Sequence, residues 1–373
     1  MSVHPARTIT FDELHSGLEA ARAAGMVVRK FDRETGRALY VYSNACVYDD
    51  GWDEFSLMAR GLILHPDERR IIATPFPKFF NAGERRGDIP TLPFETFEKV
   101  DGSLAIIHHH GGRWRAATKG AFDSAQAVTT EAMLASLDTS ALVPGTTYLA
   151  ELVGPDNRIV VRYHTAALVL LAAYDEAGTE VPLDALREVG DGLGWRTARR
   201  HSYSSFAELI ADAKSLPPTH EGFVIRFSDG LRLKLKGDEY RRIHALVSRC
   251  TPLALWESIV AGDDLDAMRR DIPEEFWADF DTIIRILKQK AVDYESRIVQ
   301  SVAAVAHLSD KELGLSGESI SEELRPFLFA YRKQGAIVGK TRDTLWRLLR
   351  PKGNILEGYE PSSGLQRVAD EAV

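Results

Sequence analysis

The sequence has few cysteines, no long apolar run and no excess of positive charge. Cys46 and Cys250 are its only cysteines and lie far apart, which argues against a disulfide framework or a thiolate metal site and fits a reducing, cytoplasmic location. Because no run of 18 apolar residues occurs and the first ten residues lack an apolar signal core, we expect neither membrane spanning nor secretion. A net charge of -8 disfavours indiscriminate polyanion binding but leaves room for a local basic cleft.

The 373 residues, 45% of them hydrophobic, suffice for about two domains. Up to about residue 236 the pattern is mostly that of strands, with a Thr10-x-x-Glu13 capping box ahead of one early helix. After Gly237, helical periodicity replaces strand alternation. We therefore expect an α+β fold, with antiparallel sheets and flanking helices over residues 1–240 and an all-helical domain over residues 241–373.

The most informative stretch is Thr96 to Ile107, which reads as a strand, a turn at Lys99-Val100-Asp101-Gly102-Ser103 and a second strand. It places Lys99 at a strand end with its amine facing outward, where it can attack a nucleotide phosphorus, while Gly102 lets the backbone approach a ligand. A polar hairpin turn with a solvated lysine explains the same letters, so this alternative stays open.

A second strand pair begins at Glu221 and ends at Lys236. Its second strand alternates, which predicts Leu231, Leu233 and Leu235 on the core side. Arg232, Lys234 and Lys236 then share the other face, where their mutual repulsion favours a polyanionic ligand. A merely solvated edge strand is the alternative.

Two further segments carry candidate residues. Pro75 to Asn81 is too rich in proline for a helix and offers Lys78 and several rings to a nucleotide, or else an aromatic plug for the core. Glu151 lies in the apolar strand Thr147 to Val153, where a carboxylate is costly unless it is paired or binds a ligand, although an exposed strand face is also possible.

In their order along the chain, these motifs resemble those of the covalent nucleotidyltransferases, the superfamily of polynucleotide ligases and capping enzymes. Within it the chain is similar to the phage-type RNA ligases that repair tRNA, the T-even phage RNA ligase family. The resemblance covers about residues 60 to 237. It is carried by Ala59-Arg60-Gly61, Pro77-Lys78-Phe79-Phe80-Asn81, Lys99 to Ser103, Lys119-Gly120, Glu151, Glu221-Gly222 and Lys234-Leu235-Lys236.

The resemblance implies an ATP-grasp-like nucleotidyltransferase domain that uses ATP and Mg²⁺ (or Mn²⁺) and joins RNA ends through a lysyl-AMP on Lys99 and an RNA-adenylate. It implies that Lys99, Lys234, Lys236 and Glu221 are catalytic and also contact the nucleotide. It adds Arg60, Lys78, Glu98, Asp101, Gly102, Lys119 and Glu151 as nucleotide contacts, and Glu151 and Glu221 as metal ligands. A free lysine, with a pKa of about 10.4, is neutral in only roughly one molecule in 2,500 at pH 7, so nearby cations are expected to favour the neutral amine of Lys99.

The expected partner is RNA, such as a nicked or broken tRNA, which the helical domain would select, with a separate kinase and phosphatase healing the ends and no membrane involved. Two other functions stay open. A GTP-dependent mRNA capping enzyme shares the lysine chemistry, but normally continues into a β-rich oligonucleotide-binding fold. A non-catalytic nucleic-acid-binding relative should have lost one of the motif residues, and none is lost.

Overall fold

The computed structural model describes residues 3–84, 88–157, 160–272, 276–315, 324–353 and 355–361. By its internal contacts the chain divides into two compact units, residues 1–242 and 243–372. The sequence places a boundary at residue 240, close to this division. That each unit is an independent domain stays a prediction, and the two are described separately below.

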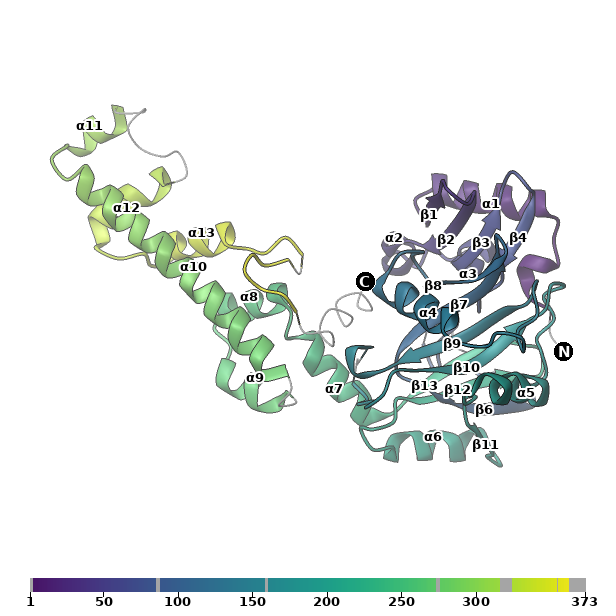
Figure 1. Cartoon of the computed structure of the whole chain (residues 1–373). Coiled ribbons are helices and arrows are strands. Elements are labelled where there is room, and N and C mark those ends of the chain that lie inside the picture. Colours follow the sequence, from purple (N-terminus) through teal and green to yellow (C-terminus); the bar gives the residue numbers. More distant parts are fainter. Residues whose placement is uncertain are drawn as a thin grey trace. The chain divides into compact units, whose positions relative to one another are not determined.

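The first unit begins with a helix on a four-stranded antiparallel sheet (Figure 1). The short helix η1 (Pro5–Arg7) precedes α1 (Phe11–Ala23), and the sheet consists of β1 (Val27–Asp32), β2 (Arg37–Tyr42), β3 (Arg60–His65) and β4 (Arg70–Ala73). α2 (Asn44–Tyr48) and α3 (Glu54–Met58) lie between β2 and β3 in the sequence. The predicted capping box is confirmed, since Thr10 and Glu13 each bond the other's backbone N–H. Leu14 and Leu18 of α1 pack on this sheet through a shared apolar core.

A second four-stranded sheet packs against the first. Its order is β10 (Ala167–Tyr174), β9 (Thr147–Val153), β7 (Ser103–His110) and β8 (Arg113–Ala117), with all pairs antiparallel. Ile63 of the first sheet and Ile106 and Leu149 of the second belong to one buried cluster. α4 (Ala125–Ala135) and α5 (Leu183–Leu193) share a second apolar cluster with this sheet, and η2 (Pro155–Asn157) follows β9. Alternate side chains along β7 and β9 thus point to opposite faces of the sheet and pack in two different cores.

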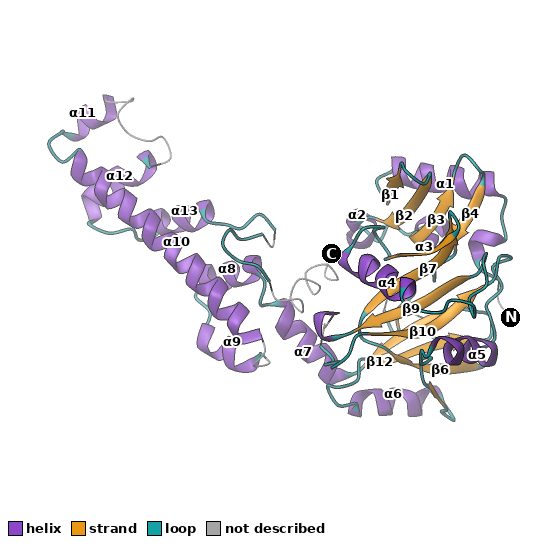
Figure 2. Ribbon diagram, viewed as in Figure 1, coloured by secondary structure: helices purple, strands orange, loops and turns teal. Residues whose placement is uncertain are grey.

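The third sheet carries Lys99. Its order is β11 (Arg200–His201), β6 (Phe94–Lys99), β12 (Gly222–Phe227), β13 (Arg232–Lys236) and β5 (Phe80–Asn81), the last pair being parallel. β6 and β12 of this sheet are labelled near α6 in Figure 2. α6 (Phe206–Ser215) covers one face, where Leu209 packs on Phe223, Ile225 and Leu233. The predicted core position of Leu231 is wrong, because this residue precedes β13 and is 43% exposed.

Register decides which side chains share the opposite face of this sheet. Gly222 pairs with both Lys99 and Lys236, so these two lysines flank it in one row. Four residues along each strand, Arg226 pairs with both Glu95 and Arg232. Since side chains four apart on a strand point the same way, one sheet face carries a lysine row at one end and an arginine–glutamate row at the other, with Lys234 between them.

The named elements of the second unit are all helices in the residues that the structure describes. They are α8 (Pro252–Ala261), α9 (Leu265–Asp271), α10 (Trp277–Ala304), α11 (Asp310–Leu315), α12 (Arg325–Gln334) and α13 (Lys340–Leu348), while α7 (Asp238–Ser248) crosses the boundary between the units. α10 is the central element, and Tyr294 on it meets Phe327 of α12 with ring centroids 5.6 Å apart. No helix in the described ranges has both the length and the apolar character that membrane crossing requires. The sequence also predicts a frayed tail over residues 356–373, and residues 362–373 lie outside the described residues.

Candidate active site

Lys99 and Glu221 are held together at the end of the third sheet. Lys99 Nζ lies 2.6 Å from Glu221 Oε2, and Lys236 Nζ lies 3.0 Å from Glu221 Oε1. Glu221 is only 3% exposed, so its charge is balanced by the two lysines rather than by water. The prediction that the Lys99 amine faces outward is therefore wrong: the side chain is turned onto the carboxylate. The structure brings Lys99, Glu221 and Lys236 together, while their catalytic roles stay a prediction.

Lys234 lies in a neighbourhood crowded with cations. Burial, followed by repulsion from Lys99, Lys78, Arg60 and Lys236, lowers the pKa of Lys234 well below its usual value. Its ammonium approaches the ring of Phe79, with 5.4 Å to the centroid. Such a site disfavours the protonated lysine and would gain stability from an anion.

Three rings surround Lys78. Its Nζ lies 5.2 Å from the ring centroid of Trp52 and 5.3 Å from those of Tyr42 and Phe80. Burial, with the charges of Arg60 and Lys119, lowers the pKa of Lys78. Phe76 and Phe79 of this segment line a core, as one interpretation of its sequence predicts; that the segment also offers Lys78 to a nucleotide stays a prediction.

Arg60 and Lys119 complete the group of cations. Arg60 lies over Phe79 at 5.6 Å, and Lys119 over Tyr42 at 5.9 Å. Gly61 brings them together: its φ is +89°, and a Cβ there would meet the Lys119 Cα at 3.0 Å. Although burial acts to raise the pKa of Tyr42, Lys119, Arg60 and Lys78 lower it on balance. Arg60 Nη1 is buried and has no hydrogen-bond partner in the described residues.

Asp101 is a buried hydrogen-bond acceptor. Its Oδ2 accepts from the backbone N–H groups of Val160 and Val161 at 2.9 and 2.7 Å, and its Oδ1 accepts from the Tyr240 hydroxyl at 2.9 Å. Burial, and then the charge of Glu221, raise the pKa of Asp101 to about 6. In this structure Asp101 fixes the turn after Lys99.

Gly102 makes a close approach to β9. A Cβ at this position would lie 2.3 Å from the Leu152 carbonyl oxygen and 3.0 Å from Glu151 Cγ. The tight approach expected of Gly102 is therefore to the neighbouring strand, and the buried Glu151 packs against the turn that follows Lys99. Only glycine fits at this contact.

Glu98 points away from this group, onto residues before β11. Its Oε1 accepts from the Arg199 backbone N–H at 2.8 Å and from Arg196 Nη1. Its carboxylate is engaged there, on the sheet face opposite Lys99.

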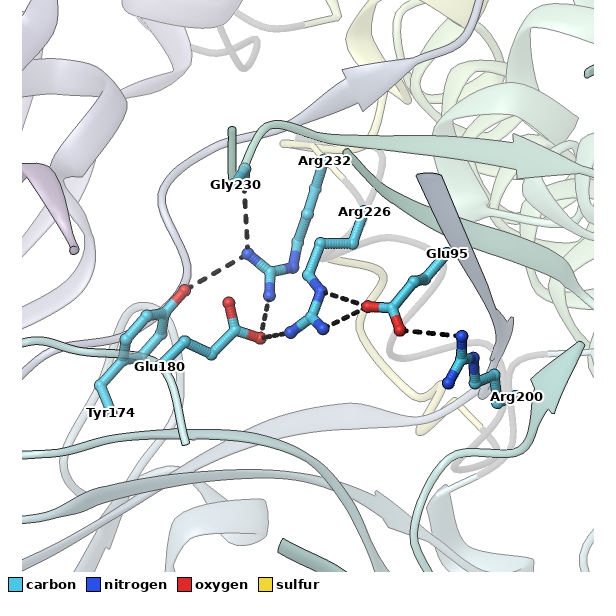
Figure 3. Close-up of polar contacts among 7 residues, drawn as sticks. All are labelled: Glu95, Tyr174, Glu180, Arg200, Arg226, Gly230 and Arg232. Carbon is cyan, nitrogen blue, oxygen red and sulfur yellow. Dashed lines mark hydrogen bonds and ion pairs between the residues drawn. The ribbon is translucent and has the colours of Figure 1, made fainter. Parts of the chain in front are cut away.

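Arg232 does not belong to the cation group, which corrects the sequence prediction that its charge is available with those of Lys234 and Lys236. Figure 3 shows Arg232 bonded to the Glu180 carboxylate and to the Tyr174 hydroxyl, the latter at 3.4 Å. Arg226 bonds the same Glu180 oxygen at 2.6 Å and also binds Glu95. This buried network joins the third sheet to β10 of the second sheet, so its role is to dock the two sheets.

No group of three or more His, Cys, Asp or Glu side chains that could hold a metal ion occurs in the described part of the chain. A metal at Glu151 or Glu221 would therefore take other ligands, such as water and phosphate oxygens. A pocket of about 650 Å³ lies beside β10 and is lined by residues of α4, the end of α5 and the segment before β10, among them Met133, Tyr163, Leu193 and Arg196. None of the predicted site residues lines it.

Comparison with solved structures identifies the class of fold. An archaeal ATP-dependent RNA ligase superimposes with a TM-score of 0.50 at 18% identity, over 75% of this chain and 83% of that one. The first unit therefore has the nucleotidyltransferase fold, with a lysine at the strand end where the sequence motifs place it.

Sequence comparison narrows this class to a family. Residues 58–240 match the family model described as RNA ligase. RNA ligase 1 of bacteriophage TS2126 is 30% identical over 217 residues, which is 51% of this chain and 50% of that protein. A protein of Autographa californica nuclear polyhedrosis virus, described as a bifunctional polynucleotide kinase/RNA ligase, is 25% identical over 56% of this chain and 34% of its own length.

Residues 58–240 are thus similar to the RNA ligase family, and curated relatives over this part of the chain include RNA ligases of phages. The chain spans between about a third and a half of the length of several curated relatives that it matches.

Three residues of this site escaped the sequence analysis. Tyr42 and Trp52, which surround Lys78, lie outside the recognised motifs, and Tyr240, which bonds Asp101, follows the last lysine motif. The position of Tyr42 at the end of β2 is only a weak sign in the sequence that its ring contacts a lysine. Only the fold brings these residues to the lysines.

Proposed function

We propose that the protein is an ATP-dependent RNA ligase that joins a 3′-hydroxyl to a 5′-phosphate. The observation that carries this proposal is the position of Lys99: its amine touches Glu221 and is flanked by Lys236 and Lys234. A nucleophilic lysine, a carboxylate and two further cations are the groups that transfer of a nucleotide to an amine requires.

In the first step, the neutral amine of Lys99 attacks the α-phosphorus of ATP. A P–N bond forms and the bond from the α-phosphorus to the bridging oxygen breaks, so that pyrophosphate leaves with the electron pair. An RNA 5′-phosphate then displaces Lys99 to give an RNA-adenylate, and a 3′-hydroxyl displaces AMP. Lys99 must lose a proton before it attacks, and Glu221 is the carboxylate within hydrogen-bond distance.

The residues present fit a triphosphate. Lys78, Lys119, Arg60 and Lys234 gather with aromatic rings, burial and mutual repulsion lower the pKa of Lys78 and Lys234, and Arg60 Nη1 has no partner in the described residues. A polyanion would relieve this repulsion and satisfy the guanidinium. These four residues, with Lys236, would hold the phosphates and stabilise the charge that develops on the leaving group.

A divalent cation fits beside Glu221. A carboxylate next to a lysine stabilises the ammonium form, so the contact with Glu221 opposes the attack that this proposal requires. Glu221, with Glu151 as a second carboxylate, would hold Mg²⁺ or Mn²⁺. The ion would offset the negative charge of Glu221 beside Lys99 and so favour the neutral amine.

We assign RNA selection to an all-helical domain formed by the second unit. Every motif that nucleotide chemistry needs lies before residue 238, and a dedicated binding domain would convert a poor encounter of RNA ends into an oriented one. A nicked or broken tRNA is the expected substrate, with its ends prepared by a separate kinase and phosphatase. A chain shortened to end after Ser248 should still form lysyl-AMP but lose its preference for a nicked anticodon stem-loop over a plain single strand.

A sealing assay tests the proposed activity. RNA labelled at its 5′-phosphate is incubated with the full chain, ATP and Mg²⁺ and then treated with phosphatase. The proposal expects label that resists phosphatase and an intermediate that migrates as RNA-adenylate. Label that stays fully phosphatase-sensitive with every RNA tried, although the protein itself becomes adenylylated, would favour a capping-type transfer instead.

A further inference from the structure

Charge is distributed unevenly along the second unit. Residues 243–324 contain 16 acidic and eight basic residues, whereas residues 325–352 contain eight basic residues and a single acidic one, Asp343. The basic stretch coincides with α12, α13 and the residues directly after them. A chain with a net charge of -8 thus concentrates positive charge on two helices.

Nearly all of this positive charge is exposed, and most of it forms no ion pair within the part of the chain that the structure describes. Arg332 is bound, to Asp310 at 3.4 Å and to the Leu308 carbonyl oxygen at 2.7 Å. The other seven basic side chains are exposed, and none forms an ion pair with a carboxylate in the described ranges; they are Arg325, Lys333, Lys340, Arg342, Arg347, Arg350 and Lys352. Arg350 lies over the Trp256 ring, 5.6 Å from its centroid, but no carboxylate within the described residues pairs with these seven cations to offset their mutual repulsion.

Helical spacing arranges these charges in ridges. Arg325, Phe329 and Lys333 are four residues apart on α12 and therefore share one face. Phe329, between the two cations, is 46% exposed. On α13, Lys340 and Arg347 are seven residues apart and also share a face. α12 and α13 contact each other and both pack on α10 (Figure 1).

We propose that these exposed faces of α12 and α13, here called the basic ridges, form an RNA-binding surface. Exposed cations match a phosphate backbone, and an exposed ring between two of them is a platform on which a base can stack. The inference rests on the proposed function, because that function makes RNA the anion to be bound. The inference adds to that function a specific RNA-contact surface within the second unit.

Binding of a fluorescein-labelled RNA hairpin, nicked in its loop, to the full chain without ATP tests this surface. Fluorescence anisotropy is measured from about 50 to 200 mM salt, where each phosphate contact contributes about 0.7 to 0.9 to the slope of log affinity against log salt. The variant carries Arg325→Gln, Lys333→Gln and Arg347→Gln together. Its control carries Arg285→Gln, Lys288→Gln and Lys311→Gln, three exposed residues of α10 and α11 with the same total charge change.

The ridge variant should lose about 2 to 3 from the salt slope and at least about tenfold in affinity at the lowest salt, whereas the control variant should change the slope by less than about 1. Phe329→Ala should weaken binding at least about fivefold with the slope unchanged, because stacking involves no counterion release. Circular dichroism and thermal unfolding establish that each variant is folded. Equal losses in both triple variants would overturn the surface in favour of general electrostatics.

Two other outcomes are distinguishable. RNA binding that the ridge variant retains, together with a change in its sedimentation from dimer to monomer, would mean that the ridges bind a second copy instead. A parent protein that binds RNA through the ridges but never becomes adenylylated would refute the proposed ligase activity and leave the surface in place. Adenylylation by the parent with ridge-independent RNA binding would refute the surface alone.

Discussion

The amine of Lys99 lies 2.6 Å from a carboxylate oxygen of Glu221, whose other oxygen is bound by Lys236. Backbone pairing fixes this arrangement, because Gly222 is in register with both lysines and Glu221 immediately precedes it. Lys99 and Glu221 thus hold each other in place. We therefore expect Glu221 to have two roles that separate measurements can distinguish, one in the chemistry and one in balancing the charge of the lysines.

Glu221→Gln should impair both roles. We expect self-adenylylation to fall at least about tenfold, because the variant lacks the carboxylate that touches Lys99. We also expect the variant to be less stable than the parent by up to a few kcal/mol, since two lysines lose their counter-charge. Both effects are measured on purified protein, by bound label and by thermal unfolding. Glu188→Gln, an exposed position on α5, is the control and should change neither quantity.

Lys234→Met should separate stability from activity. The folded-state pKa of Lys234 lies below its unfolded value, so the folded protein binds fewer protons than the unfolded chain between these two values. The lysine therefore destabilises the fold at neutral pH, and this penalty shrinks as pH rises towards about 10.4. We expect the Met variant to be inactive in adenylylation yet to unfold a few °C higher at pH 7, since about 1 kcal/mol shifts Tm by roughly 2–4 °C at this size. A lower Tm at pH 7, or a difference that grows with pH, would show that Lys234 is stabilised by a partner.

Arg232→Ala should lower stability and leave self-adenylylation nearly unchanged, the opposite of what we expect for Lys234→Met. It removes a guanidinium from the buried network around Glu180 that joins the third sheet to β10, and breaking such a network costs on the order of 3–5 kcal/mol. Self-adenylylation per folded molecule should change little, while Lys236→Ala should reduce it strongly. Thermal unfolding and labelling at a temperature where all variants are folded test this contrast. Equal activity losses for Arg232→Ala and Lys236→Ala would mean that the strand face acts as one electrostatic surface.

The pKa of about 6 for Asp101 has a consequence for stability. A carboxyl group whose folded-state pKa is raised contributes stability that is present below about pH 4, its unfolded value, and is lost as pH rises through 6. The Tm of the parent, relative to that of Asp101→Asn, should therefore fall from pH 4 to pH 6 and then stay constant. A difference that moves in the parent's favour over this range would mean that Lys99 or the backbone N–H groups dominate the ionisation of Asp101.

The sequence predicted most elements of the first unit because their signals are local. The capping box at Thr10, the apolar run of β9 and the alternation along β13 depend only on residues close in the chain. The grouping of Lys99, Glu221, Lys234 and Lys236 was also predictable, through the order of known motifs.

Side-chain partners were not predictable, because they depend on long-range packing. Strand alternation predicts Arg232 on the same face as the two lysines, but its guanidinium forms an ion pair with Glu180, 52 residues earlier. Lys99 was expected to face outward, but Glu221, 122 residues later, binds its amine. Tyr240 gave no sign in the sequence that it bonds Asp101, 139 residues away.

The central claim, that Lys99 is the nucleotide acceptor, is tested most directly by incubating the protein with Mg²⁺ and α-labelled ATP or GTP and measuring label on the denatured chain. We predict label from ATP, none from GTP, and none on Lys99→Ala, whereas Lys30→Ala, at an exposed position of β1, should be labelled like the parent. The Lys99→Ala variant should still seal RNA that is already adenylylated, since that step does not use the amine. Covalent label on a folded Lys99→Ala protein would contradict the account.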